Sequence, residues 1–398
     1  MGFFSSLLPR ASWQPNWSPW DDRWYGGGGG INGAVTSAAG VGVSPELALN
    51  CSAVFACVRV LAETFAQVPL VIYERMPDGG KRRATEHPLY SVLHDTPNAW
   101  QTSFEFRETL VVHLALRGNA YAQIVPGPRG FADQLVPQHP DRVTVNQLGD
   151  GKLLYKVTGR DGVSRPVPQD EMIHVRGLST RGVLGLSVVS CAAQSIGISL
   201  AGDRQAAATF ANGARPGLVL KHKGTLTPEG RKNLEESWKA NYSGDKAGGV
   251  AVLEEGVEPE QISLTWKDAQ FLESRQFQIG EIARWFRMPP HMIGDLARAT
   301  FSNIEQQSLE FVTYTMLPYF VRAEQAFTRD LILDPERYFI SFVVDGLLRG
   351  DSLARAQGYQ LGIQSGWMTR NEARRLENLD ALPGLDEPLE PLNMAPAG

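Results

Sequence analysis

The chain has 398 residues, 43% of them hydrophobic and 20% charged, which is enough for a substantial core and, at this length, for two or three domains. Its net charge of -5 argues against a protein that grips nucleic acid by neutralising phosphates, but not against one that lets nucleic acid slide past. No run approaches the ~18 continuous apolar residues of a membrane span, so we expect no membrane association.

The three cysteines, Cys51, Cys57 and Cys191, are an odd set in apolar helical contexts. They are typical of small core residues in a reducing compartment rather than of disulfides or metal ligands. The first residues also lack the basic and then apolar pattern of a secretion signal. We therefore expect a soluble protein that is made and used in a cytoplasm.

Residues 1–43 are predicted to form a flexible N-terminal arm. Prolines and a glycine run at residues 26–30 surround or follow its four tryptophans, which are Trp13, Trp17, Trp20 and Trp24. Two interpretations stay open: a floppy tail, or a segment whose tryptophans dock on a neighbour or partner. Residues 28–33 formally fit G-x-G-x-x-G, but no strand precedes them and no crossover unit follows, so we expect no dinucleotide or other cofactor.

Residues 44–184 have the pattern of one α+β domain. A helix is expected to begin after Ser44, and a second one after the capping box of Thr102 and Glu105. His113 in that second helix has no second ligand at helical spacing, so we interpret it as a core or flank histidine. Turn residues then separate five strand-like runs, at residues 120–125, 134–136, 142–147, 153–157 and 172–175.

The next segment, residues 187–212, is predicted to be a helix about 40 Å long at 1.5 Å per residue. It is rich in Ala, Ser and Gly, and small side chains allow close helix packing, which suits contact with copies of the same chain. A compact α/β insert follows, rich in charges of both signs. Its cations are Lys221, Lys223, Arg231, Lys232 and Lys239.

A helix from about residue 266, a double proline and a longer second helix form the stretch around which we expect the chain to be organised. Pro289 and Pro290 end the first helix, and Ser302 with Glu305 resembles a capping box for the second. Pro318 lies within the apolar stripe of the second helix and predicts a kink there. A strand at residues 338–344 is expected to return to the first sheet, followed by two helices, at residues 351–364 and 369–379, and a disordered tail from 383.

Short segments in this order resemble the portal proteins of HK97-like tailed phages, over roughly residues 48–380. The segments that carry the resemblance are Ala53-Val54-Phe55-Ala56-Cys57-Val58, Val68-Pro69-Leu70, His87-Pro88-Leu89, Pro97-Asn98, Gly118-Asn119-Ala120-Tyr121, Phe210-Ala211-Asn212-Gly213-Ala214, Asp268-Ala269-Gln270-Phe271-Leu272-Glu273-Ser274-Arg275, Ser302-Asn303-Ile304-Glu305-Gln306-Gln307, Leu347-Leu348-Arg349-Gly350-Asp351 and Asn371-Glu372-Ala373-Arg374.

The resemblance implies a portal fold and a ring, usually dodecameric, at one vertex of a capsid in a phage, prophage or gene transfer agent. Double-stranded DNA would enter and leave through it, and the terminase motor, the head–tail adaptor and the major capsid protein would be its partners. Assembly would take place in the host cytoplasm. The implied divisions are a wing (44–184 and 302–346), a stem (185–213 and 266–288), a clip (214–265), a tunnel loop (289–301) and a crown (347–382). The N-terminal arm has no counterpart in the family pattern, and the crown is short.

From the residues of the implied tunnel loop we expect weak, transient contact with phosphates. Met292, Ile293 and Leu296 would form an apolar constriction, with Arg298 and His291 able to touch the duplex beside Asp295. In the alternative, Ile293 and Leu296 pack back onto the second helix and Arg298 pairs with a neighbouring subunit. The clip cations would likewise face either the motor or adaptor, or only solvent.

An enzyme is disfavoured, and we assign no catalytic residue and no metal site. The chain contains no G-x-x-x-x-G-K-[ST] phosphate loop, no nucleophile elbow and no H-E-x-x-H. The paired acids at residues 235–236 and 254–255 are adjacent and point in different directions, so they do not make a metal pair. The alternative functions are another ring-forming head–tail adaptor, from which a shorter chain would be expected, or a nucleic-acid-processing enzyme.

Overall fold

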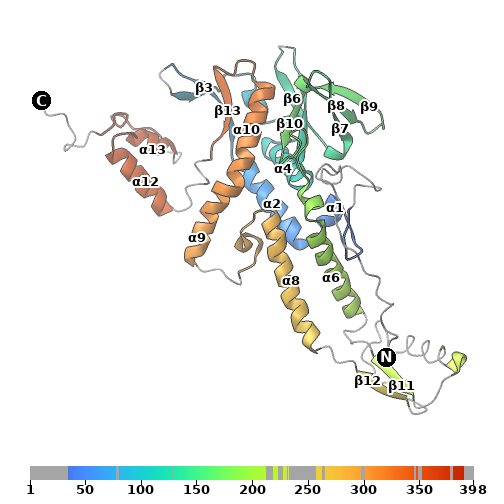
Figure 1. Ribbon diagram of the computed structural model, residues 1–398. Coiled ribbons are helices and arrows are strands. Elements are labelled where there is room, and N and C mark those ends of the chain that lie inside the picture. The colour runs from blue at the N-terminus through green and yellow to red at the C-terminus, as the bar shows by residue number, and fades with distance from the viewer. Residues whose placement is uncertain are drawn as a thin grey trace.

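Helix α2 (Ser52–Ala66) lies at the centre of the molecule, which Figure 1 presents as a computed structural model with a broad α/β head above two long helices. Val54, Leu61 and Phe65 on one face of α2 are buried, as their helical spacing predicts. The structure describes residues 35–77, 80–128, 130–211, 218–222, 227–230, 232, 257–261, 265–296, 301–344, 347, 352–376 and 380–389.

Eleven α-helices are described in these residues, together with short 3₁₀ turns and one π-helical segment. The α-helices are α1 (Pro45–Ala48), α2, α3 (Tyr90–His94), α4 (Ser103–Arg117), α5 (Val188–Cys191), α6 (Ala193–Ala211), α8 (Thr265–Trp285), α9 (Phe301–Glu310), α10 (Leu317–Leu331), α12 (Ser352–Gln364) and α13 (Arg370–Leu376). The others are η2 (Pro140–Arg142), η3 (Gln169–Glu171), η5 (Pro290–Ile293) and the π-helix η6 (Phe311–Met316).

Three antiparallel sheets make up the head, and the last strand of the chain closes one of them. Tyr338–Phe342 (β13) pairs with β3 (Leu70–Arg75), which confirms the predicted return of this strand to the first sheet. The ring of Phe65 in α2 packs against α10 and β13, with its centroid 5.0 Å from that of Phe320 and 4.8 Å from that of Phe342. The sheets have the strand orders β13-β3-β4, β10-β5-β6 and β7-β8-β9.

The remaining strands of the head follow the predicted runs closely. They are β4 (Lys81–Arg83), β5 (Asn119–Pro126), β6 (Ala132–Gln138), β7 (Val143–Gln147), β8 (Leu153–Thr158), β9 (Ser164–Pro168) and β10 (Met172–Arg176). The sequence pattern does not predict β4 and β9. Both are edge strands and are mostly exposed, so they lack the apolar pattern that marks a buried strand.

Helices α6 and α8 pack against each other and run from the head to the small sheet of β11 (Leu218–His222) and β12 (Val257–Gln261) (Figure 1). The long helix predicted at residues 187–212 is broken at Ala192, where α5 ends and α6 begins one residue later. Much of the predicted α/β insert lies outside the described residues, which in this part of the chain are 218–222, 227–230, 232 and 257–261. No helix in the described part of the chain is long and apolar enough to cross a membrane.

The expectation of a flexible arm up to residue 43 is wrong for its last part. Val35–Thr36 (β1) pairs with Gly42–Val43 (β2), and the side chains of Val35, Val41 and Val43 are buried. The valines give this hairpin an apolar face, and burial of that face holds the hairpin against the rest of the subunit. The tryptophans and the glycine run lie outside the described residues.

The expected disordered tail also makes defined contacts where the structure describes it, at residues 380–389. Asn371 of α13 donates its backbone N–H to the carbonyl of Leu385, 3.1 Å away, and its side chain bonds the backbone of Leu382. Thr369 and Glu372 form a capping box at the start of α13: the Thr369 N–H donates to the Glu372 carboxylate at 2.7 Å, and the Glu372 N–H donates to the Thr369 Oγ1 at 3.1 Å. The helix α9 already includes Phe301, so Ser302 lies inside that helix and not at its N-cap.

Candidate functional site

The apex between α8 and α9 is a tight turn fixed by backbone geometry. Arg287 adopts a positive φ of 53°, which is unusual for a residue with a side chain. The 3₁₀ turn η5 follows, and Gly294 closes it with a φ of 85°, a conformation that glycine adopts without strain. The N–H of Asp295 donates to the carbonyl of Pro290 at 3.0 Å.

The side chains of this apex divide between core and solvent. Met292 and Ile293 are partly buried and pack against the main hydrophobic core. The His291 Nδ1 lies 2.9 Å from the Oε1 of Gln307, which ties the turn to α9. Leu296 is 62% exposed, whereas Arg298 lies outside the described residues. Within one subunit, therefore, Leu296 is the apolar side chain of the predicted constriction that faces solvent.

The second long helix contains a π-helical segment, η6, before Pro318. The N–H of Leu317 bonds the carbonyl of Val312, a five-residue step in place of the usual four. A proline ring clashes with the carbonyl four residues before it and has no N–H to donate. The wider turn accommodates Pro318, which is the second residue of α10, and it puts the irregular part of the helix ahead of the proline.

A buried hydrogen bond connects η6 to the apex. Thr315 is buried and its Oγ1 donates to the carbonyl of Arg287 at 2.7 Å. This carbonyl belongs to the residue with the unusual positive φ. The π-helical segment therefore holds the backbone of the turn at the point where the chain leaves α8.

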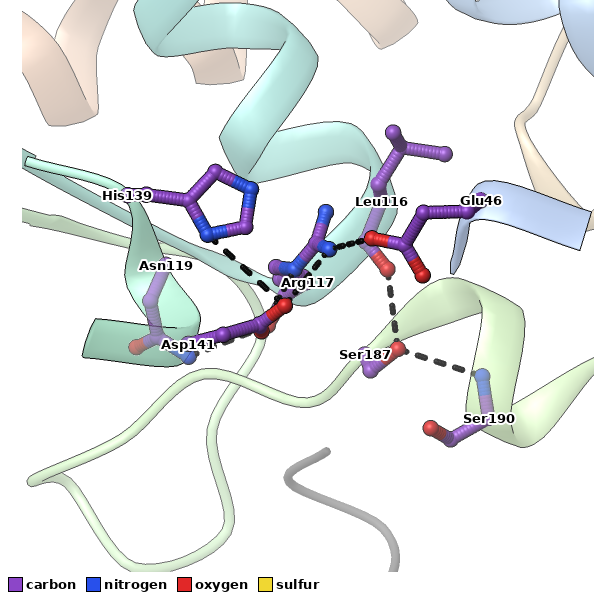
Figure 2. A network of polar contacts seen from close by, with 8 residues as sticks. All are labelled: Glu46, Leu116, Arg117, Asn119, His139, Asp141, Ser187 and Ser190. Atoms are coloured by element: carbon purple, nitrogen blue, oxygen red, sulfur yellow. Dashed lines mark hydrogen bonds and ion pairs between the residues drawn. The ribbon is translucent and has the colours of Figure 1, made fainter. Parts of the chain in front are cut away.

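A second polar network, drawn in Figure 2, holds α1, η2 and α5 against the end of α4. Arg117, the last residue of α4, donates to both carboxylate oxygens of Asp141 at 2.7 and 2.8 Å, and also to Glu46. Ser187 donates to the carbonyl of Leu116 at 2.8 Å and accepts the N–H of Ser190 at 3.1 Å, so it caps α5 and anchors it to α4.

The chain crossing beside this network requires glycine. Gly118 ends α4 with a φ of 70°, and a Cβ on it would lie 2.0 Å from the carbonyl oxygen of Leu186. A Cβ on Gly185 would lie 2.0 Å from the carbonyl oxygen of Gly118. Asn119 fills the remaining bonds, accepting the N–H of Gly185 at 2.8 Å and donating to its carbonyl at 3.0 Å. The chain thus enters α5 past a backbone contact between Gly118 and Gly185 that has no room for a side chain at either position.

Two histidines adjoin the Arg117 network. His113 and His139 lie edge to face, with ring centroids 5.2 Å apart, and the Nδ1 of His139 is 3.7 Å from Asp141. Burial lowers the pKa of His113 to about 3, and its buried Nδ1 has no hydrogen-bond partner. Burial also lowers the pKa of His139. Burial acts to raise the pKa of Asp141, but the hydrogen bonds and charge of Arg117 outweigh it and hold that pKa below its usual value.

Glu46, His139 and Asp141 bring possible ligand atoms within 4.8 Å of one another. The guanidinium of Arg117 bonds both carboxylates, so it already supplies the positive charge that a cation would bring. We interpret this cluster as the polar contact that holds α1 and η2 against the end of α4. The sequence analysis missed its members because they come from α1, α4 and η2, and only the Ser187 position, a serine before an apolar helix, carries a local signal.

Little of the predicted clip surface can be placed. Lys221 lies in β11, and Lys232 is exposed. Lys223, Arg231 and Lys239 lie outside the described residues, as do the acidic pairs at residues 235–236 and 254–255.

Comparison with known proteins shows the family to which this chain belongs. The family model described as "Phage portal protein" matches residues 52–378. The chain is 35% identical over 379 residues to the portal protein of Enterobacteria phage HK97, an alignment that covers 91% of this chain and 89% of that protein. It is 33% identical over 436 aligned positions to the probable portal protein of Streptomyces phage phiC31, covering 100% of this chain and 90% of that one. The chain belongs to the phage portal protein family.

Solved structures agree with the observed architecture. A chain from the virion of a native gene transfer agent particle superposes with a TM-score of 0.59 at 25% identity, covering 85% of this chain and 92% of that one. A chain from the neck of an empty particle of the same kind has a TM-score of 0.59 at 26% identity, covering 82% and 90%. The HK97-family phage portal protein from Corynebacterium diphtheriae shares the fold, with a TM-score of 0.58 at 20% identity over 80% of this chain and 99% of that one.

Proposed function

We propose that this chain is the portal subunit of a phage-like particle, a head–tail connector that forms a dodecameric ring at one capsid vertex. The observation that carries the proposal is the near full-length match to portal proteins of two phages, together with a fold found in particle necks. Double-stranded DNA would pass through the ring during packaging and ejection. The terminase motor, the head–tail adaptor and the major capsid protein would bind its outer surfaces, after assembly in the host cytoplasm.

We assign the parts of the subunit on this basis. The wing would be residues 44–184 and 302–346, the stem 185–213 and 266–288, and the clip 214–265. The crown would be residues 347–382. The hairpin of β1 and β2 packs on α6, so we add residues 35–43 to the wing–stem junction.

The assembly is tested first by electron microscopy of the purified full-length chain. We expect rings with an open centre, and cryo-EM classes with twelvefold symmetry. A stable single-copy species, or a closed assembly with a plugged centre, would overturn the proposal. A head–tail adaptor is the less favoured function because the chain spans 89% or more of the length of the portal proteins that it matches.

We assign the tunnel loop to residues 289–301, with Leu296 and Arg298 nearest the DNA and His291 and Asp295 beside them. Supporting this, Leu296 is exposed while Met292 and Ile293 pack on the core. Replacing residues 295–300 by a shorter Gly-Ser linker should reduce DNA filling of particles, measured by nuclease-protected DNA. An equal replacement in the exposed turn at residues 148–151 is the control. Unchanged DNA filling in the first variant would refute a guiding role for the loop.

We assign the clip cations Lys221, Lys223, Arg231, Lys232 and Lys239 to the surface that meets the motor or the adaptor. The position of β11 and β12 at the far end of the two stem helices supports this (Figure 1). Reversing the charge of Lys232 and Lys239 together should weaken binding of the purified terminase or adaptor to intact rings, measured by surface plasmon resonance. Unchanged affinity for both proteins would leave these cations as a solvated face.

A further inference from the structure

The long helix of α9, η6 and α10 has two apolar faces. One face carries Phe311, Met316 and Phe320, which are buried in the core. The other face is exposed to solvent. Its large apolar residues, with their exposed fractions, are Leu309 (44%), Tyr314 (60%), Leu317 (42%) and Val321 (38%), and we call these four residues the outer stripe.

The π-helical segment aligns the outer stripe. Its members are five, three and four residues apart. In an uninterrupted α-helix, residues five apart would point about 140° from each other, so Leu309 and Tyr314 would lie on different faces. The π-helical segment begins between Leu309 and Tyr314, and because its hydrogen bond spans five residues its wider turn reduces this angle. The outer stripe extends about 18 Å along the helix from Leu309 to Val321.

The chemistry of this surface fits protein and not nucleic acid. The other exposed side chains on this face are Gln306, Glu310, Thr313 and Gln325. Between Gln306 and Gln325 the one basic residue is Arg322, which is half-buried. A surface that binds duplex DNA needs cations to displace the counterions of the phosphates. Large contiguous apolar surfaces are instead typical of protein interfaces.

We propose that the outer stripe is one half of the contact between neighbouring subunits, and that its occupant is the α1–α6 side of a second copy. This inference rests on the proposed ring. In a closed ring of identical subunits, each contact joins two different surfaces, which must lie on opposite sides of the subunit. Figure 1 shows α9 and α10 on one side of α2 and α8, and α6 on the other side, and the contacts of η6 with α2 and of α6 with α8 agree with this arrangement.

The α1–α6 side has a hollow with an exposed apolar residue at it. Leu47 of α1 is 41% exposed and lies in the wall of this hollow. A cleft of about 310 Å³ lies between these helices, lined by Leu47, Asn50, Leu200, Asp203, Arg204 and Ala207. An aromatic side chain such as that of Tyr314 is the kind of residue that anchors an interface by filling such a cleft.

The test replaces Tyr314 and Leu317, one at a time, by Glu in the full-length chain. Burying an uncompensated carboxylate at the contact should lower the fraction of chains in rings at least tenfold at a fixed protein concentration, as measured by mass photometry. The control is Val163→Glu in the β8–β9 turn, because Val163 is 52% exposed and belongs to neither the outer stripe nor the lining of the cleft. Circular dichroism melts of all variants check that the subunit folds, and Tyr314→Phe should retain rings.

A photo-crosslinking residue at position 314 identifies the occupant. We expect crosslinks between subunits that map to α1 or α6 by mass spectrometry. Normal rings in both Glu variants, or crosslinks from position 314 to DNA or to an adaptor protein, would overturn the inference while leaving the portal function intact. If the wild-type chain forms no ring under any packaging condition, the proposed function and this inference both fail.

Discussion

At the scale of single residues, Arg117 joins three segments that are distant in the sequence. Its side chain is 7% exposed, whereas those of Glu46 and Asp141 are 58% and 56% exposed. The two carboxylates are therefore well hydrated, and solvent reduces the value of the ion pairs. The bidentate bond to Asp141 still fixes η2 against the end of α4, because a planar guanidinium accepts only a narrow range of orientations.

Arg117→Met keeps most of the apolar stem of this side chain and removes its charge. We expect a loss of about 1–2 kcal/mol in the free energy of unfolding, measured by urea titration, because the hydrogen bonds to a partly exposed charge are lost. A double-mutant cycle with Asp141→Asn isolates their interaction. Purely additive losses in that cycle would show that Asp141 does not depend on Arg117.

His113 makes the stability of the subunit depend on pH. Its pKa is lowered to about 3 in the folded chain, compared with an ordinary value near 6.5, so the unfolded chain binds the proton more readily. The stabilisation is complete above about pH 6.5 and is lost as the pH falls toward 3, by up to about 1.4 kcal/mol per pH unit. The lowered pKa values of His139 and Asp141 act in the same direction.

His113→Phe should therefore reduce the drop in melting temperature between pH 7.5 and pH 5, measured by scanning calorimetry. His94→Phe is the matched control, since the side chain of His94 is 37% exposed at the surface of α3. A pH profile of the His113 variant that follows the wild type would show that this buried imidazole is not the source of acid sensitivity.

At the scale of the elements, η6 supports the apex through the bond from Thr315 to Arg287. Thr315→Val preserves the shape of the side chain and leaves a buried carbonyl without its donor, so we expect a loss of about 1–2 kcal/mol in the free energy of unfolding. Amide hydrogen exchange should also accelerate in residues 287–292. Thr313→Val, at an exposed position of the same segment, should change neither quantity. Unaltered exchange at the apex would contradict the supporting role.

The elements differ in how far the sequence alone could define them. The capping box of Thr102 and Glu105 and the apolar spacing of α2 predicted these helices correctly, because the signals lie within a few residues. The breaks before Ser52 and at Ala192 carry no proline, so local pattern gave no reason to expect them. Pro318 predicts a kink in the second long helix, and that kink stays a prediction; the π-helical segment η6 that precedes Pro318 has no local sequence signal, and its Thr315 bonds Arg287, 28 residues earlier.

At the scale of the whole molecule, the order of segments predicted the family, and the portal family match confirms it. The polar contacts at the end of α4 could not be predicted. Glu46, Arg117 and Asp141 come together, and Ser187 reaches the backbone of α4, only after α1, α4, η2 and α5 have packed. The predicted apex was located at the correct prolines, but the inward packing of Met292 and Ile293 depends on the core beneath them. Long-range packing, and not local propensity, determines both sites.

The direction of α5 and α6 relative to the head depends on the close backbone approach of Gly118 and Gly185, which we call the crossing. Gly185→Ala would place a Cβ 2.0 Å from the carbonyl oxygen of Gly118 and 2.7 Å from the N atom of Gly177, so two backbone segments would have to move. Neither is the end of a flexible side chain that can rotate away. Because α6 extends far from this contact, a small shift at the crossing becomes a large displacement at the sheet of β11 and β12.

We therefore expect Gly185→Ala to lower the free energy of unfolding by about 2–4 kcal/mol, the range of strong overpacking, and to reduce the yield of closed rings. Calorimetry and negative-stain microscopy measure the two effects. Gly149→Ala is the matched control, since a Cβ at position 149 meets no atom within 4 Å. Ring closure requires each subunit to present its two contact surfaces at a fixed angle. If Gly185→Ala lowered the free energy of unfolding but left ring closure unchanged, the crossing would contribute to folding without determining the angle between α6 and the head.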